Sequence, residues 1–142
     1  MPLEGTRGSE TRVGAYLRRD VPTCRLDERL SDVRARVRVA GWDACFVVND
    51  EQIVLGRLSR SALAQDDDVT VEQAMSAPPS TVRPSFELDR AVERMRSQRL
   101  STLPVTTSEG RLLGVLERDT AEQALRELRR ESARAVSKGS QP

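Results

Sequence analysis

Residues 103–116, with the sequence LPVTTSEGRLLGVL, contain two apolar runs on either side of a polar turn. Leu103–Thr106 predicts a strand, in which Pro104 lies near the start, where a missing backbone donor is tolerated. Ser108–Gly110 predicts a turn, because Ser and Gly are typical turn residues. Arg111–Leu116 predicts the next strand, so the stretch is interpreted as strand, turn, strand.

A helix is predicted upstream of these strands. Its apolar positions share one helical face, at i, i+3, i+4 and i+7; they are Leu88, Ala91, Val92 and Met95. Ser85 is the expected N-cap, and a short strand is expected at Thr81–Arg83. A further helix is expected from about Glu117.

The same order of elements occurs earlier in the chain. Shifting the sequence by 58 positions aligns Val13–Ser61 with Val71–Asp119 without a gap, with twelve identities in 49 positions. Gly56 and Gly114 are one identical pair, and Arg36 and Arg94 are another. The first copy is expected to contain strands at Pro22–Cys24, Ala44–Asn49 and Ile53–Leu58, and helices at Glu28–Ala40 and from Ser59. Asp66–Asp68 separates the copies, and a short helix, Val71–Met75, leads into the second.

A repeat of about 50 residues is too small to bury both faces of its sheet. We therefore expect an α+β fold in which two βαββα repeats pack sheet to sheet with pseudo-twofold symmetry, leaving a cleft between them. A simple α+β domain with a chance repeat is the alternative interpretation.

Composition narrows the function. The 142 residues include 23 Lys+Arg and 22 Asp+Glu, a net charge of +1, which argues against general nucleic-acid binding. The chain has no His, the commonest general base and metal ligand. Cys24 and Cys45 form no CxxC motif, and no apolar run is long enough to span a membrane. We expect a cytoplasmic protein that is not an enzyme and needs no metal or other cofactor.

Four segments of the second copy resemble the CBS domain: Met75–Pro84 (MSAPPSTVRP), Ala91–Met95 (AVERM), Leu103–Val105 (LPV) and Gly110–Leu116 (GRLLGVL). The first copy resembles it more loosely. Together they resemble a tandem CBS pair, or Bateman module, over roughly Gly14–Leu125. The expected division is a disordered tail (1–12), a first repeat (13–68), a second repeat (69–125), and a basic C-terminal helix end and tail (126–142).

The resemblance implies a function. CBS pairs are typically regulatory, bind AMP, ATP or S-adenosylmethionine in the cleft between their repeats, and often form dimers. We therefore expect a stand-alone homodimeric module that senses an adenosine-type nucleotide and acts on an unidentified protein target. The alternative is a ligand-free dimerisation or protein-interaction module with degenerate nucleotide sites.

The family carries a Gly-x-x-Ser/Thr-x-x-Asp pattern after its last strand, which implies a hydroxyl for phosphate and an Asp for ribose. In the first copy Ser59 fits the hydroxyl position, but Ala62 replaces the Asp. Arg57 and Arg60 are expected either to pair with phosphate oxygens or to be solvated surface residues.

In the second copy Glu117 replaces the hydroxyl and would repel phosphate. Thr120 occupies the Asp position, with Asp119 one residue early and Arg118 beside it. Neither copy keeps the full pattern.

The residues that would form a pocket for the base are expected in the first and second strands of each copy. The alternative is that the same residues are ordinary core and strand-edge positions. They are Thr23, Cys24, Ala44 and Cys45 in the first copy and Thr81, Val82, Thr102, Leu103 and Pro104 in the second.

Two further features allow alternatives. Trp42 is expected in an interface or in the core rather than stacked on a ligand. The basic residues Arg126–Lys138 are interpreted as a solvated helix end, with contact to an acidic partner or nucleic acid as the alternative.

Overall fold

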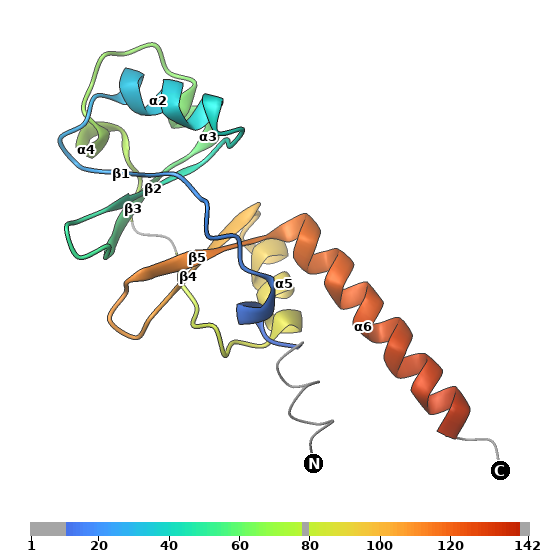
Figure 1. Cartoon of the computed structure of the whole chain (residues 1–142). Helices are drawn as coiled ribbons and strands as arrows, with labels where there is room; N and C mark the ends of the chain where they lie inside the picture. The colour runs from blue at the N-terminus through green and yellow to red at the C-terminus, as the bar shows by residue number, and fades with distance from the viewer. Residues whose placement is uncertain (1–10, 78–79, 140–142) are drawn as a thin grey trace. The chain divides into compact units, whose positions relative to one another are not determined.

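A computed structural model describes residues 11–77 and 80–139, and the side chains up to residue 134. The expected mixture of α and β structure is confirmed (Figure 1). The elements are η1 (Val13–Tyr16), β1 (Thr23–Cys24), α2 (Leu30–Val39), β2 (Cys45–Val48), β3 (Val54–Leu58), α3 (Arg60–Leu63), α4 (Val71–Ala74), α5 (Leu88–Ser97), β4 (Thr102–Thr106), β5 (Leu112–Glu117) and α6 (Arg118–Gly139).

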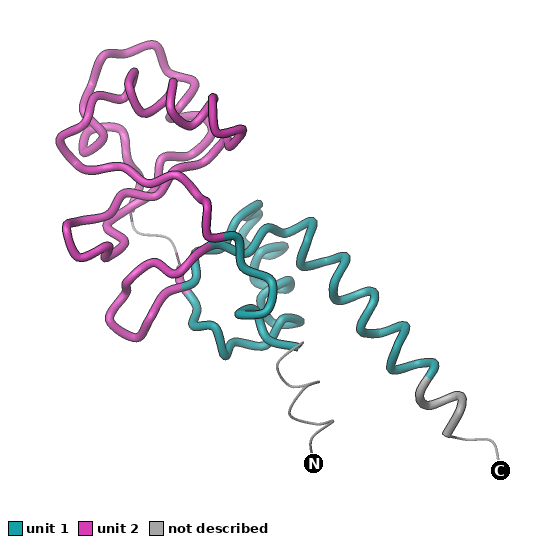
Figure 2. Tube along the Cα trace, in the orientation of Figure 1, with its two compact units in different colours: residues 1–18, 82–105, 115–142 teal, residues 19–81, 106–114 magenta. Residues whose placement is uncertain are grey.

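The chain forms two compact units, each built from separate stretches of sequence (Figure 2). Unit 1 takes its residues from 1–18, 82–105 and 115–142. Unit 2 takes its residues from 19–81 and 106–114.

Unit 2 contains a three-stranded sheet in the order β1-β2-β3. β1 runs parallel to β2, with Thr23 opposite Phe46, and β2 runs antiparallel to β3, with Cys45 opposite Leu58. Helices α2, α3 and α4 lie against one side of this sheet (Figure 1). The core beneath them contains Cys24, Leu30, Val33, Val37, Cys45, Val47, Leu58, Ala62, Leu63 and Val71.

The hairpin tip at residues 106–114 also belongs to unit 2. The Val54 amide donates to the Gly110 carbonyl at 3.1 Å, and the Leu112 amide donates to the Gln52 carbonyl at 2.9 Å. The turn of each hairpin is therefore hydrogen-bonded to the first residue of the other hairpin's second strand.

Unit 1 contains β4 up to Val105 and β5 from Val115, packed with α5 and α6. The predicted strand at Thr81–Arg83 is reduced to one parallel bridge between Val82 and Val105. All four predicted apolar positions of α5 are buried, as the helical spacing requires. The core contains Val13, Val82, Leu88, Ala91, Val92, Met95, Leu100, Leu103, Val105, Leu116, Ala121 and Ala124.

The first residue of α2 and the first residue of α5 each donate a backbone hydrogen bond to a segment from the other repeat, the segment that precedes that repeat's own first elements. In unit 2 the Leu30 amide donates to the Val69 carbonyl at 2.9 Å. In unit 1 the Leu88 amide donates to the Thr11 carbonyl at 2.7 Å. These residue pairs are related by the same offset of 58, so the repeats exchange their leading segments.

This exchange shifts two predicted helix starts. Ser85 is not the N-cap of α5, because the helix begins at Leu88 after the capping residue Glu87. Similarly, α2 begins at Leu30 rather than Glu28. In each case the preceding backbone pairs with the exchanged segment rather than continuing the helix: the Glu28 carbonyl accepts from Val71 and the Phe86 carbonyl accepts from Val13.

The terminal predictions are only partly within the described residues. Helix α6 continues through Ser137 to Gly139, where a tail was expected, while residues 140–142 lie outside the described residues. At the other end, Arg12 forms an antiparallel bridge with Glu87. Residues 1–10 of the expected tail lie outside the described residues.

Candidate functional site

The candidate residues of the first repeat are gathered at one edge of the sheet in unit 2. The parallel pairing places Thr23 and Cys24 beside the start of β2, which follows Ala44. The antiparallel pairing of Cys45 with Leu58 brings Ser59 to the same edge. The structure therefore brings these five candidates together.

Ser59 has a structural role at this edge. It is the N-cap of α3, where its hydroxyl accepts from the Ala62 amide at 3.2 Å and lies 3.0 Å from the Ser61 hydroxyl. Ala62, at the position where the family pattern has Asp, is buried. The first repeat therefore has a hydroxyl beside its last strand but no carboxylate at the expected place.

Arg60 follows Ser59 at the start of α3. Its side chain is 86% exposed, and its Nε is 3.9 Å from a carboxylate oxygen of Asp43. It lines a cavity between α2 and α3, together with Arg34 and Trp42. The expected partnership of Arg60 with Ser59 around one phosphate stays a prediction.

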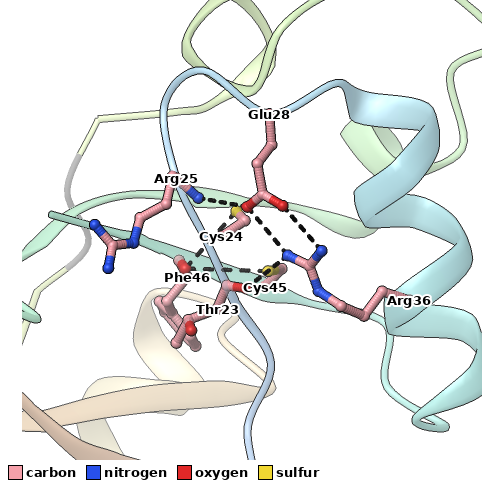
Figure 3. Close-up of polar contacts among 7 residues, drawn as sticks. All are labelled: Thr23, Cys24, Arg25, Glu28, Arg36, Cys45 and Phe46. Atoms are coloured by element: carbon pink, nitrogen blue, oxygen red, sulfur yellow. Dashed lines mark hydrogen bonds and ion pairs between the residues drawn. The ribbon is translucent and has the colours of Figure 1, made fainter. Parts of the chain in front are cut away.

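A polar cluster fastens β1 to α2 (Figure 3). The Arg36 guanidinium donates to both carboxylate oxygens of Glu28, at 2.9 and 3.1 Å, and to the Thr23 carbonyl at 2.9 Å. The Arg25 amide donates to Glu28 at 2.7 Å. The hydrogen bonds from Arg36 lower the pKa of the Glu28 carboxyl.

Both thiols lie in the core beneath this cluster (Figure 3). The Cys24 and Cys45 sulfurs are 3.8 and 4.0 Å from the Phe46 carbonyl oxygen. The hydrogen bond with the Cys24 thiol, together with burial, raises the pKa of the Cys45 thiol. A raised pKa keeps the thiol protonated and weakly nucleophilic, in line with the interpretation of these residues as small buried groups.

Unit 1 gathers the candidates of the second repeat in the same way. The Val82 amide donates to the Pro104 carbonyl at 3.2 Å, which joins the leading segment to β4. The Arg118 amide donates to the Ser101 carbonyl at 2.9 Å, which places the start of α6 beside the start of β4. Among the remaining candidates Thr102 and Leu103 are buried, whereas Thr81, Asp119 and Thr120 are exposed.

Charged groups around the start of α6 are paired. Glu117, which replaces the hydroxyl of the family pattern, has a carboxylate oxygen 3.3 Å from an Arg18 guanidinium nitrogen. Arg118 and Arg96 both contact the Glu122 carboxylate, at 3.2 and 2.6 Å, and hydrogen bonding from Arg96 lowers the Glu122 pKa. Arg118 is therefore engaged within α6, and Asp119 is the exposed carboxylate of the first turn.

The sequence interpretation missed the role of Glu28 and Arg36. One signal for it was the identity of Arg36 with Arg94 in the repeat alignment. Arg94 lies over the Phe86 ring, 4.9 Å from its centroid, and Phe86 is the counterpart of Glu28. An arginine on the repeat helix therefore contacts the residue two positions before that helix in both copies.

Two kinds of feature are absent from the described part of the chain. No group of three or more His, Cys, Asp or Glu side chains there is arranged to hold a metal ion. None of the described helices combines the length and apolarity needed to cross a membrane.

The comparisons identify the repeats. The model of the CBS domain matches residues 13–66 and again residues 71–127. The chain is 27% identical over 112 residues to an uncharacterized protein, MK0525, of Methanopyrus kandleri, covering 73% of this chain and 57% of that relative.

Two solved structures share the fold. CBSX2 in complex with AMP matches with a TM-score of 0.75 and 20% identity, over 83% of this chain and 98% of that one. The cytosolic domain of the Mg2+ channel MgtE in complex with ATP matches with a TM-score of 0.74 and 22% identity, over 80% and 48% respectively. The fold and the two like sets of strand-edge segments define a tandem α+β repeat module. The chain belongs to the CBS domain family.

Proposed function

We propose that this chain is a non-catalytic regulatory module that binds an adenosine-type ligand at the strand-edge segments of its repeats. The observation that carries the proposal is the convergence, in each repeat, of the strand starts with the residues that follow the last strand. Solved structures with this fold hold AMP in CBSX2 and ATP in the MgtE cytosolic domain, which supports a nucleotide as the ligand class.

The second repeat is the better binding site. Asp119 is exposed in the first turn of α6, where it is available to accept hydrogen bonds from ribose hydroxyls. The start of a long helix attracts anions through its backbone N–H groups. The contact between Arg18 and Glu117 offsets the negative charge that would otherwise repel a phosphate at this point.

The remaining residues of this site supply the base pocket. Val82, Leu103 and Pro104 offer buried apolar surface, and their backbone groups lie at the strand starts. A purine needs apolar walls and a few backbone donors and acceptors to be recognised. Thr81 and Thr102 add hydroxyl groups on either side of these residues.

The regulatory step is a change in how two copies of the chain associate. A ligand shifts such an equilibrium only if it binds the two arrangements unequally. We propose a homodimer whose association changes when an adenosine-type ligand binds, and an unidentified protein that responds to the change.

A specific observation favours a second candidate, a ligand-free interaction module. In the first repeat the position of the ribose-binding Asp is a buried Ala62, and the Ser59 hydroxyl is already bonded within α3. This repeat lacks the acceptor that a ribose needs.

Calorimetry with AMP, ATP and S-adenosylmethionine tests the proposal. We expect at least one to bind, and Asp119→Asn to weaken that binding about tenfold, as for loss of a charged hydrogen-bond acceptor. Asp89→Asn, which changes an acidic residue in the first turn of α5, is the matched control and should bind normally. Absence of both heat and a thermal shift with all three ligands would favour the interaction module, and sedimentation would then test for a dimer that forms without ligand.

A further inference from the structure

We propose that the cavity between α2 and α3 in unit 2 binds a small organic anion with a flat apolar body. The cavity has a volume of about 360 Å³, at the lower end of the range of about 300–1,000 Å³ typical of small-molecule sites. It is lined from the two helices and from the segment between α2 and β2. Its lining shares Arg60 with the strand-edge candidates but includes none of the others, so it is a separate site from the one proposed above.

Arg34 provides the first argument. Its Nε donates to the Leu63 carbonyl at 2.6 Å, which holds the guanidinium in place at the wall of the cavity. Its Nη2 is buried and has no hydrogen-bond partner among the described residues. A buried guanidinium N–H without an acceptor is costly, and a carboxylate or phosphate oxygen is the acceptor that would satisfy it.

The charge of the lining provides the second argument. Arg34, Arg38 and Arg60 contribute three positive groups, whereas Asp43 contributes one negative group. Asp43 is 3.9 Å from Arg60, and both side chains are largely exposed, so this contact offsets little of the excess. The lining therefore carries a formal charge of +2 and favours an anion.

The apolar wall provides the third argument. Trp42 and Leu63 line the same cavity and pack against the core of unit 2. Ligand sites commonly combine such aromatic and aliphatic walls with a few charged groups that fix orientation. A ligand that joined a flat apolar body to one acidic group would use both parts of the lining.

Trp42 also makes the site measurable, because it is the only tryptophan of the chain. The experiment titrates the intact protein with phenyl phosphate and follows the fluorescence of Trp42. Inorganic phosphate and phenol are the single-part comparisons. We expect saturable binding of phenyl phosphate that is at least about tenfold tighter than that of inorganic phosphate, because the ring covers the apolar wall.

Variants assign the binding to this cavity. Arg34→Gln should weaken phenyl phosphate binding about tenfold or more, as for loss of a hydrogen bond to a charged group. Because Arg34 also bonds to Leu63, Arg38→Gln serves as a second variant on the exposed side of the helix, with an expected loss of about threefold. Arg29→Gln removes an exposed arginine of the same unit that does not line the cavity, and should bind within about twofold of the unaltered chain.

Three results would overturn the proposal. They are a fluorescence response that does not saturate, equal binding by all three variants, and a Trp42 signal that follows protein concentration rather than phenyl phosphate. The last would mean that a second copy of the chain fills the cavity. None of these results depends on nucleotide binding at Asp119, so this site and the proposed function fail independently.

Discussion

Arg94 lies with its guanidinium carbon 4.9 Å from the centroid of the Phe86 ring, and 58 residues earlier Arg36 forms two hydrogen bonds with Glu28. The two repeats thus fasten the same helix to the segment before it by different chemistry. A cation–π contact changes little with acidity, whereas an ion pair with a carboxylate is lost when the carboxylate is protonated. The contact between the helix and the segment before it is therefore acid-sensitive in the first repeat and not in the second.

Replacing Glu28 by Gln should lower the free energy of unfolding by about 0.5–1 kcal/mol at neutral pH. The pKa of Glu28 is lowered in the folded state, so the carboxylate stabilises the protein above its ordinary pKa of 4.5, and this contribution is lost as the pH falls through the lower folded value. Urea unfolding of both proteins should therefore show a difference at neutral pH that disappears in strong acid. Asp27→Asn, a neighbouring exposed carboxylate, is the control, and a pH-independent difference for Glu28→Gln would contradict the assignment.

Gly56→Ala should destabilise the protein by about 1–3 kcal/mol. An added Cβ would lie 2.7 Å from the Ser76 carbonyl oxygen and 2.8 Å from the Met75 sulfur, and the backbone contact cannot move aside easily. Thermal unfolding measures the effect. Gly41→Asn is the comparison, because that position has open space and a φ of +78° that Asn tolerates, so it should be nearly neutral. Equal effects of the two changes would refute the close-packing argument.

The two thiols should react slowly with Ellman's reagent in the folded protein and completely after unfolding in guanidinium chloride. Both are buried, and the hydrogen bond with Cys24 raises the pKa of the Cys45 thiol. Since this raised pKa favours the protonated form in the folded state, stability should also fall as the pH rises above the ordinary thiol pKa of 9.0. Cys45→Ala should reduce that alkaline loss, and rapid labelling of the native protein would show that the thiols are accessible.

Ser59→Ala should cost about 0.5–2 kcal/mol, because it removes the N-cap of α3. Ser59→Thr keeps the hydroxyl and should retain most of the stability. Ser61→Ala is the control, since the Ser61 hydroxyl contacts only that of Ser59 in this cap. If calorimetric unfolding gave the same loss for Ser59→Ala and Ser61→Ala, the cap would not be the source of the stability.

Local patterns predicted the elements but not their ends. The burial of Leu88 and Met95 follows from helical spacing, which depends only on neighbouring residues. The start of α5 depends instead on Thr11, which is distant in sequence and accepts from the Leu88 amide. Ser85 therefore looked like a cap, although the tertiary contact places the cap at Glu87.

The candidate site was likewise predicted only where it depends on local pattern and strand pairing. The resemblance implied one site from the strand starts and the residues after the last strand, and strand pairing brings these segments together in each repeat. It could not predict the direction of the Arg60 side chain, which depends on Asp43 and the neighbouring cavity. The role of Arg36 was also missed, because the two equivalent arginines have different partners. Arg36 bonds to Glu28, whereas Arg94 lies over Phe86.

The backbone passes from one unit to the other after Arg18, Thr81, Val105 and Gly114. A gene severed between the repeats would therefore not yield two autonomous proteins, since each fragment would lack the strip of chain that closes its own helix start. Duplication alone does not explain such a molecule, because the two copies have become structurally indispensable to each other. We therefore expect the two repeats to unfold together in a single thermal transition.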